Sequence, residues 1–375
     1  RYPFPVMLPH LPYDNPCWHY RRTFNLKKKA GEKYYLNFEG VDSAFYLYIN
    51  GQFKGYSQIS HATSEFDITE LAVNGENTVD VLVLKWCIST YLECQDKFRF
   101  SGIFRNVYML TRPENHITDY KIETSFSDDN GILTFINESP VSIKISLENN
   151  DVIVPAGMKS EMVVPNVKRW TADEPNLYTL ELYANGEKII EKIGFREIKI
   201  DGKVFKINGE AVKLKGVNHH DTHETKGYCM NYDDLLKDVL LMKEYNVNCV
   251  RTSHYPPDPH FLELCDHFGL YVVDEADIET HGLYHLGCEG TAISNDLKWA
   301  KHYMDRVRRM YYRDRNHVAI TMWSLGNEAE GYKCQDKCYQ MLKEIGTAIP
   351  VHYESVCRTK RYHYDVFSEM YTHPD

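Results

Sequence analysis

The sequence predicts a protein of two halves, an all-β amino-terminal half and a carboxyl-terminal half in which strands and helices alternate around a parallel sheet. Apolar and polar residues alternate with a period of two up to about residue 198, which is typical of strands with one buried face. From about residue 199, short apolar runs are separated by amphipathic segments of helical period. This second pattern is typical of successive βα units.

In the first half, runs with the strand period cover 34–38, 44–49 and 78–84. Asn-Gly dipeptides supply the positive φ angles that tight hairpins require. They stand at 50–51, 74–75, 130–131 and 185–186. The stretch Thr111-Arg112-Pro113 separates a longer strand-rich block from a shorter one of about 85 residues, a size that fits one immunoglobulin-like sandwich. We therefore expect three domains, at 1–113, 114–198 and 199–375.

The second half begins a regular series of strands and helices. We expect strands at 214–217, 248–251, 270–275 and 318–325, followed by a fifth near 351–353 and a sixth near 366–371. Helices are expected at 233–245, near 260–268 and at about 296–313. On the last of these, Trp299, Tyr303, Val307 and Met310 are expected to face inward, and Arg306, Arg309 and Arg313 to face solvent.

Polar residues follow each of the first four strands of this series. They are Asn218 to Asp221, Arg251 to His254, Asp274 to His281, and Asn327 with Glu328. In a β/α architecture the active groups sit at the carboxyl ends of the strands. A single histidine of this kind is most often a buried group with one backbone hydrogen bond, but four such strand ends in succession predict an active site.

Composition excludes some partners. The net charge of -10 and a pI near 5.9 disfavour a nucleic-acid partner, which would require a clustered basic surface. No apolar run is long enough for a membrane span. The ten cysteines include no Cys-x-x-Cys pair, so we expect free thiols in a reducing, cytoplasmic compartment. The start at Arg1 shows neither an initiator methionine nor a signal peptide, so we expect a cut amino terminus.

Several segments resemble glycoside hydrolase family 2, and within it the β-galactosidases of the long bacterial type. In the second half they are 216–220, 250–256, 273–282, 313–317 and 323–328; in the first half they are Gln95-Asp96, 101–105 and 194–196. The resemblance runs in order along the whole chain. It implies a jelly-roll sugar-binding domain, an immunoglobulin-like sandwich and a truncated (β/α)8 TIM barrel with strands 1 to about 6. It also implies a retaining hydrolase of β-galactosides that is homo-oligomeric when intact.

The resemblance assigns roles to individual residues. Glu328 matches the general acid/base, and Asn327 matches the residue that hydrogen-bonds the 2-hydroxyl of the sugar. Glu279 and His281 match residues that bind Mg²⁺ together with Glu328.

Further matches concern the sugar and the nucleophile. His220 and His254 match histidines that contact galactosyl hydroxyls, with Arg251 supporting the floor of the site. Tyr371 matches a tyrosine that hydrogen-bonds the nucleophile. Asp96 matches a carboxylate that binds the 6-hydroxyl and Na⁺, and its charge would repel a glucuronate.

The chain also departs from the family pattern. Four extra residues lie between Glu279 and Glu328, around 287–291. The family nucleophile is a glutamate on the seventh strand, beyond residue 375, so we expect this chain to supply the acid/base without the nucleophile and to be inactive alone. Glu354 and Glu369 face the same end, and we expect them to be hydrogen-bond partners of neighbouring strands.

Two alternatives to a β-galactosidase stay open. The first is another family 2 glycosidase, a β-glucuronidase or a β-mannosidase. The second is a noncatalytic carbohydrate-binding protein with a degenerate barrel.

Overall fold

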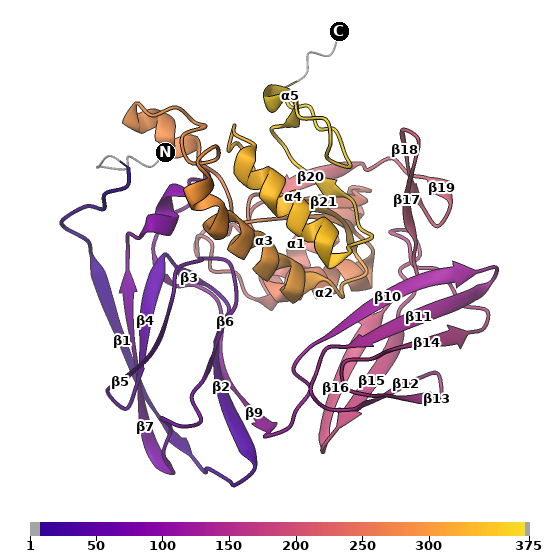
Figure 1. The fold of residues 1–375 in the computed structure, drawn as a ribbon, viewed down its shortest axis with the longest axis horizontal. Helices are drawn as coiled ribbons and strands as arrows, with labels where there is room; N and C mark the ends of the chain where they lie inside the picture. Colours follow the sequence, from indigo (N-terminus) through magenta and orange to yellow (C-terminus); the bar gives the residue numbers. More distant parts are fainter. Residues whose placement is uncertain (1–7, 372–375) are drawn as a thin grey trace.

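The computed structural model describes residues 8–371, apart from the side chain of His285. It shows two β-sandwiches with a βα unit above and between them (Figure 1). No helix among the described residues is long and apolar enough to cross a membrane.

The first sandwich is formed by β1 to β9. Its larger sheet has the strand order β1-β7-β4-β5, a second sheet has the order β6-β2-β9, and β3 pairs with β8. The elements are β1 (Cys17–Leu26), β2 (Glu32–Phe38), β3 (Val41–Asp42), β4 (Ala44–Ile49), β5 (Gln52–Ser57), β6 (Ser64–Asp67), β7 (Gly75–Leu84), the 3-10 turn η1 (Ile88–Tyr91), β8 (Gly102–Ile103) and β9 (Val107–Pro113). Inward-facing residues such as Phe45, Leu47 and Val83 are completely or almost completely buried.

The predicted turn at Asn50-Gly51 is confirmed, since it joins β4 to β5 with positive φ at both residues, 51° and 77°. The turn between β10 and β11 differs from the prediction. Its positive φ falls at Asp128, whereas Gly131 lies inside β11. A Cβ at Gly131 would stand 2.5 Å from the Phe195 ring, so close packing requires this glycine.

The second sandwich packs two antiparallel sheets, of order β10-β11-β14 and β13-β12-β15-β16. Its strands are β10 (Tyr120–Ser127), β11 (Asn130–Asn137), β12 (Ile143–Leu147), β13 (Asn150–Val154), β14 (Lys159–Val164), β15 (Tyr178–Ala184) and β16 (Glu187–Ile193). A small sheet follows, made of β17 (Ile198–Asp201), β18 (Val204–Ile207) and β19 (Glu210–Ala211).

The βα unit contains one parallel sheet of order β20-β21-β22-β23-β24. Its strands are β20 (Gly216–His219), β21 (Cys249–Thr252), β22 (Tyr271–Glu275), β23 (Ile320–Ser324) and β24 (Val351–His352). The helices are α1 (Tyr232–Glu244), α2 (Pro259–Phe268), α3 (Ala300–Asp314), α4 (Lys333–Ile345) and α5 (Val356–Thr359), with 3-10 turns η2 (His281–Leu286) and η3 (Leu297–Trp299). Every residue of β22 and β23 is buried, as expected for a parallel sheet covered by helices.

Two expectations for this unit need correction. A sixth strand is predicted near 366–371. Among the described residues this segment forms only one isolated parallel bridge, between His352 and Val366. The predicted inward face of the long helix is confirmed, but two of the three arginines predicted to face solvent do not face it. The Arg313 side chain is only 14% exposed and forms two hydrogen bonds to Asp314. The second is Arg306. It is buried, and its guanidinium donates to Glu93 of the first sandwich at 2.7 Å.

Candidate active site

The predicted site residues of the βα unit lie together at the carboxyl ends of its parallel strands. His220 follows β20, His254 follows β21, Glu279 and His281 follow β22, and Asn327 and Glu328 follow β23. Gly326 makes the turn into Asn327, with φ of 110°, and a Cβ there would lie 2.7 Å from the Ile278 carbonyl oxygen. The chain therefore leaves β23 along a path that only glycine permits without strain.

Arg251, at the end of β21, organises the centre of the site. Its guanidinium forms two hydrogen bonds to Glu275, of 2.7 and 3.0 Å, and donates to Asn327 Oδ1 at 3.0 Å. Glu275 also contacts His254 Nδ1 at 2.6 Å and accepts from Ser324 at 2.6 Å. Burial alone would raise the pKa of Glu275, but Arg251 and His254 hold it well below its usual range. Glu275 is therefore an ionised carboxylate that fixes Arg251 and His254.

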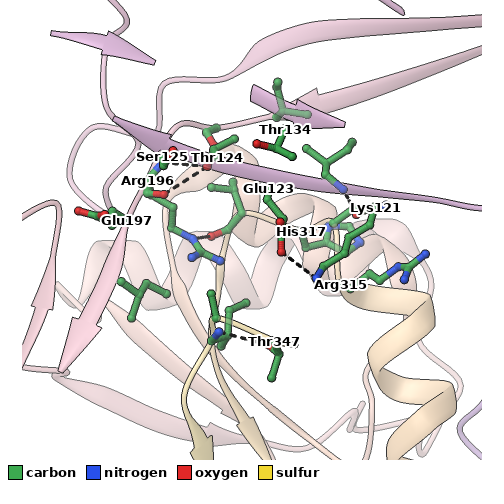
Figure 2. Close-up of a pocket in the computed structure, with 18 of the residues that line it drawn as sticks. Lys121, Glu123, Thr124, Ser125, Thr134, Arg196, Glu197, Arg315, His317 and Thr347 are labelled. Atoms are coloured by element: carbon green, nitrogen blue, oxygen red, sulfur yellow. Dashed lines mark hydrogen bonds and ion pairs between the residues drawn. The ribbon is translucent and has the colours of Figure 1, made fainter. Parts of the chain in front are cut away.

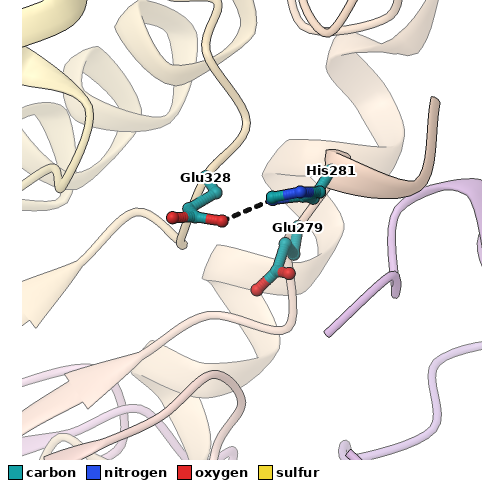
Figure 3. A group of neighbouring side chains, drawn as sticks. All are labelled: Glu279, His281 and Glu328. Atoms are coloured by element: carbon teal, nitrogen blue, oxygen red, sulfur yellow. Dashed lines mark hydrogen bonds and ion pairs between the residues drawn. The ribbon is translucent and has the colours of Figure 1, made fainter. Parts of the chain in front are cut away.

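Glu279, His281 and Glu328 form a compact cluster (Figure 3), in which one ligand atom from each lies within 4.8 Å of the others. His281 Nδ1 is 2.5 Å from Glu328 Oε2, and the Asn327 amide donates to Glu279 Oε2 at 2.8 Å. Burial and the charge of Glu328 raise the pKa of Glu279 to about 7. Two carboxylates and an imidazole this close together form a donor set that suits a bound cation.

His220 and His254 face each other at the rim, with ring centroids 5.4 Å apart and planes at 89°. The Tyr255 hydroxyl lies 3.1 Å from His220 Nδ1 and accepts the Asp221 backbone N–H at 3.2 Å. Burial, and then the neighbouring His254, lower the pKa of His220 to about 4. His220 is therefore a neutral imidazole at neutral pH, suited to exchanging hydrogen bonds with uncharged hydroxyls.

The structure brings Asp96 of the first sandwich to the same rim. Asp96 is exposed and shares a hollow of about 630 Å³ with His220, Thr222 and Phe98. Its neighbour Gln95 is buried and donates to the His254 carbonyl oxygen at 3.1 Å. Residues more than a hundred positions apart in the sequence therefore form one wall of the site.

Tyr371 is the last predicted site residue. Its hydroxyl lies 3.4 Å from Glu328 Oε1, while the side chain is 84% exposed. Arg358, on α5, lies nearby: one of its nitrogens is 3.7 Å from both Glu328 Oε1 and Glu354 Oε1, and another is 3.8 Å from Glu330. Glu354 is buried and accepts from the Ser355 hydroxyl at 2.6 Å, whereas Glu369 is exposed.

A second hollow, of about 350 Å³, lies at the opposite end of the sheet (Figure 2). It is bounded by Thr124 and Arg196 of the second sandwich and by Val318 and Thr347, which precede β23 and β24. Arg196 donates there to the carbonyl oxygens of Val318 and Ile320. This is the amino-terminal end of the strands, opposite to the candidate active site. The contacts of Arg196 therefore join two domains and do not belong to that site.

Sequence reasoning missed several residues that shape the site, namely Glu275, Tyr255, Asp277 and Arg358. Glu275 could have been found, since it stands in the polar run after the third strand. No sequence pattern marks Arg358 as a site residue, because its contacts with Glu328 and Glu354 depend on how α5 packs against the carboxyl ends of the strands.

Two β-sandwiches ahead of a parallel βα sheet, with carboxylates and an imidazole at its strand ends, are the features of a multidomain glycoside hydrolase. Three family models match the chain in order: the sugar binding domain of glycosyl hydrolases family 2 at residues 1–113, a second family 2 domain at 115–196, and the family 2 TIM barrel domain at 198–375. The chain belongs to glycosyl hydrolases family 2.

Curated relatives are similar over nearly the whole chain. A β-galactosidase of Staphylococcus xylosus is 41% identical over 402 aligned positions, covering 100% of this chain and 40% of the relative. A β-galactosidase of Lactococcus lactis is 40% identical, covering 94% of this chain and 37% of the relative. The chain thus spans about two fifths of the length of these relatives.

Solved structures confirm the fold. A β-D-glucuronidase of Dictyoglomus thermophilum superposes with a TM-score of 0.78 at 22% identity, covering 91% of this chain and 66% of that chain. A β-glucuronidase of an uncultured Clostridium has the same TM-score at 23% identity, covering 90% and 62%.

Proposed function

We propose that this protein takes part in the hydrolysis of terminal β-D-galactose residues from β-galactosides, by a retaining double displacement in which Glu328 is the general acid/base. One observation carries the proposal. Glu328 stands at the carboxyl end of β23 beside an Asn327 whose two polar side-chain atoms are held by Arg251 and Glu279. A carboxyl group and a fixed hydrogen-bonding amide at one strand end suit proton transfer to a glycosidic oxygen.

Asn327 is oriented by its partners. Its Oδ1 accepts from Arg251, and its Nδ2 donates one hydrogen to Glu279. An amide nitrogen carries two hydrogens, so the second is positioned to bind a sugar hydroxyl. Glu328, held by His281 and Tyr371, would first protonate the leaving oxygen and then deprotonate the attacking water.

We propose that Glu279, His281 and Glu328 hold Mg²⁺. The donor set supports this proposal, because two carboxylates and one imidazole within 4.8 Å of one another match a hard divalent cation completed by waters. When bound, the ion would supply positive charge that favours the ionised form of Glu328. Na⁺ at Asp96 is proposed on the family resemblance alone, and no chemical step depends on it.

The substrate proposal rests on Asp96 and on the relatives. The curated relatives are β-galactosidases at about 40% identity, whereas the glucuronidase structures, all below 25% identity, are similar in fold alone. An exposed carboxylate beside His220 can accept a hydrogen bond from a hydroxymethyl group and would repel a uronate. A glucuronidase stays the second candidate, because Lys97 and Arg99 line the same hollow.

A retaining mechanism needs a second, ionised carboxylate about 5 Å from the acid/base. Among the described residues, Glu275 is fully buried and occupied by Arg251, His254 and Ser324. Burial raises the pKa of Glu354, which disfavours the ionised form that a nucleophile requires. We therefore propose that the nucleophile lies outside residues 8–371.

The test uses the intact gene product. It should hydrolyse nitrophenyl β-galactoside in preference to nitrophenyl β-glucuronide, and Glu328→Gln should lower kcat/KM by about 10²- to 10⁴-fold. Glu344→Gln, on the exposed face of α4, serves as the matched control. A preference for the glucuronide would replace the substrate proposal.

Trapping with a 2-deoxy-2-fluoro galactoside identifies the nucleophile directly. Mass spectrometry of the labelled protein should find the sugar on a carboxylate outside residues 8–371. A label on Glu354 or Glu369 would show that this part of the protein supplies the nucleophile.

The assembly and location of the protein are also proposals. From the family resemblance we propose a cytoplasmic homo-oligomer. Sedimentation of the intact protein tests its oligomeric state, and cell fractionation tests its location.

A further inference from the structure

Asp277 is a completely buried carboxylate between β22 and Glu279, and the first sandwich surrounds it with hydrogen-bond donors. Its Oδ1 accepts from the Gln95 side-chain amide at 2.7 Å. Its Oδ2 lies 2.9 Å from His61 Nδ1 and 3.3 Å from the His61 backbone nitrogen. Both oxygens of a barrel carboxylate are therefore bound by the sugar-binding domain.

The geometry fixes the tautomer of His61. An ionised Asp277 only accepts hydrogen bonds, so Nδ1 carries the proton and Nε2 is an acceptor. Lys97 Nζ lies 2.9 Å from Nε2, where a lysine acts as donor. Burial and the charge of Lys97 lower the pKa of His61 to about 3, which keeps the ring neutral. The ring also stacks on Tyr255, with centroids 3.9 Å apart and planes at 13°.

Backbone hydrogen bonds extend this contact between domains to Glu279, one of the proposed metal ligands. The Glu279 N–H donates to the Leu92 carbonyl oxygen at 2.6 Å, and the Cys94 N–H donates to the Glu279 carbonyl oxygen at 3.1 Å. Glu93 and Glu279 thus form a parallel bridge between the two domains. We use the name Asp277 clamp for the contacts of 277–279 with His61 and with 92–95.

The clamp is one hydrogen bond away from the reacting groups. The Asn327 N–H donates to the Ile278 carbonyl oxygen at 2.9 Å, inside the clamped segment. On the other side, Gln95 precedes Asp96 and also donates to the His254 carbonyl oxygen. The clamp therefore joins the Asp96 wall of the site to the strand ends that carry Glu279 and Asn327.

We propose that Asp277 is a positioning residue which, through His61 and Gln95, fixes the Asp96 loop of the sugar-binding domain relative to Glu279 and Asn327. The effect on catalysis rests on the proposed function. Loosening this contact displaces groups on both sides of the bound sugar, and misplacement by about 1 Å can lower the rate by up to about a hundredfold.

The experiment compares three variants of the intact protein. Asp277→Asn keeps the shape of the side chain but turns an N–H toward one of its present donors. His61→Phe keeps the ring on Tyr255 and removes the side-chain hydrogen bonds to Asp277 and Lys97. Asp305→Asn, at a half-exposed carboxylate on α3 that pairs with Arg309, is the control.

Two measurements are made on each variant. The first is kcat/KM for nitrophenyl β-galactoside divided by that for nitrophenyl α-L-arabinopyranoside, which has the same ring without the hydroxymethyl group that Asp96 would bind. We expect this ratio to fall by about tenfold in Asp277→Asn and His61→Phe. The second is hydrogen exchange of the amides in 90–96 and 276–282, which should become faster in these two variants than in Asp305→Asn.

The two measurements separate the possible failures. Faster exchange with an unchanged ratio would mean that the clamp only adds local stability, and would overturn the positioning role. Unchanged exchange would overturn the clamp itself. A wild-type protein without activity on the galactoside would contradict the proposed function, while the exchange measurement would still decide whether the clamp exists.

Discussion

The polar side chains at the carboxyl ends of the parallel strands hold one another in place through shared hydrogen-bond partners. Arg251 binds Glu275 and Asn327 together, Glu275 also holds His254, and Asn327 in turn holds Glu279. Each functional side chain is thereby restrained by a second polar group. Such support is what keeps catalytic groups within a few tenths of an ångström of a productive geometry.

Glu279 gives a pH-dependent prediction for the metal-free protein. Its pKa is raised from 4.5 to about 7, so the folded state binds its proton more tightly than the unfolded state. The stabilisation is fully present below pH 4.5 and is lost as the pH rises through about 7, amounting to about 3 kcal/mol.

Chemical denaturation in the presence of a chelator measures this dependence. The free energy of unfolding of the wild type should fall over that interval relative to Glu279→Gln. Saturating Mg²⁺ should stabilise the wild type most at the upper end of the interval, because the ion binds the deprotonated carboxylate. An identical pH dependence in the two proteins would contradict the assignment of Glu279.

At the scale of elements, the loops that follow the strands carry the candidate active site, and their geometry depends on backbone contacts. Asn327 follows β23 after Leu325 and Gly326, and Gly326 has a positive φ of 110°. The Asn327 N–H donates to the Ile278 carbonyl oxygen. The loop after β22 is therefore packed directly under the loop after β23. A change in either loop should move both.

Gly326→Ala tests this coupling. The added Cβ would stand 2.7 Å from the Ile278 carbonyl oxygen at a positive φ, so we expect a loss of about 1–3 kcal/mol of stability together with a lower kcat. Gly346→Ala is the control, since Gly346 also has positive φ but its Cβ would meet no atom within 4 Å. Unfolding midpoints and kcat of both variants in the intact protein decide the matter, and a normal kcat in Gly326→Ala would refute the coupling.

At the scale of the whole molecule, the first sandwich and the βα unit are joined by buried charge. Arg306 of α3 donates to Glu93 Oε1 at 2.7 Å, and both side chains are almost completely buried. Glu93 also accepts from the Ser60 hydroxyl at 2.5 Å. The contact between the first sandwich and the βα unit therefore depends on these polar groups pairing with one another.

This pair predicts a non-additive response. Burial and the charge of Asp277 raise the pKa of Glu93 to about 8, so the test is made at about pH 9, where Glu93 is ionised. There Arg306→Met should cost about 3–5 kcal/mol, because it leaves the buried Glu93 carboxylate without its counter-charge. The double variant Arg306→Met with Glu93→Gln should recover much of that loss, since no buried charge then remains unpaired. Equilibrium unfolding of the single and double variants gives the coupling energy. Equal losses of stability in the single and the double variant would show that the ion pair between Arg306 and Glu93 does not hold the two domains together.

The sequence by itself determined the order of the domains, most strands and the strand ends that carry the site. These features follow from local periodicity, because the period of two residues in a strand and of 3.6 residues in a helix can be recognised from consecutive residues. Even the convergence of His220, His254, Glu279 and Glu328 follows from the rule that parallel strands present their carboxyl ends at one edge.

Only the tertiary structure decided which residues support that edge and from which domain they come. Arg306, read from helical period as a solvated residue, is buried because the first sandwich covers that face of α3. Asp277, Gln95 and His61 likewise meet across distances in sequence that no local pattern encodes. Contacts between domains depend on how whole surfaces fit, so their partners become known only once the chain is folded.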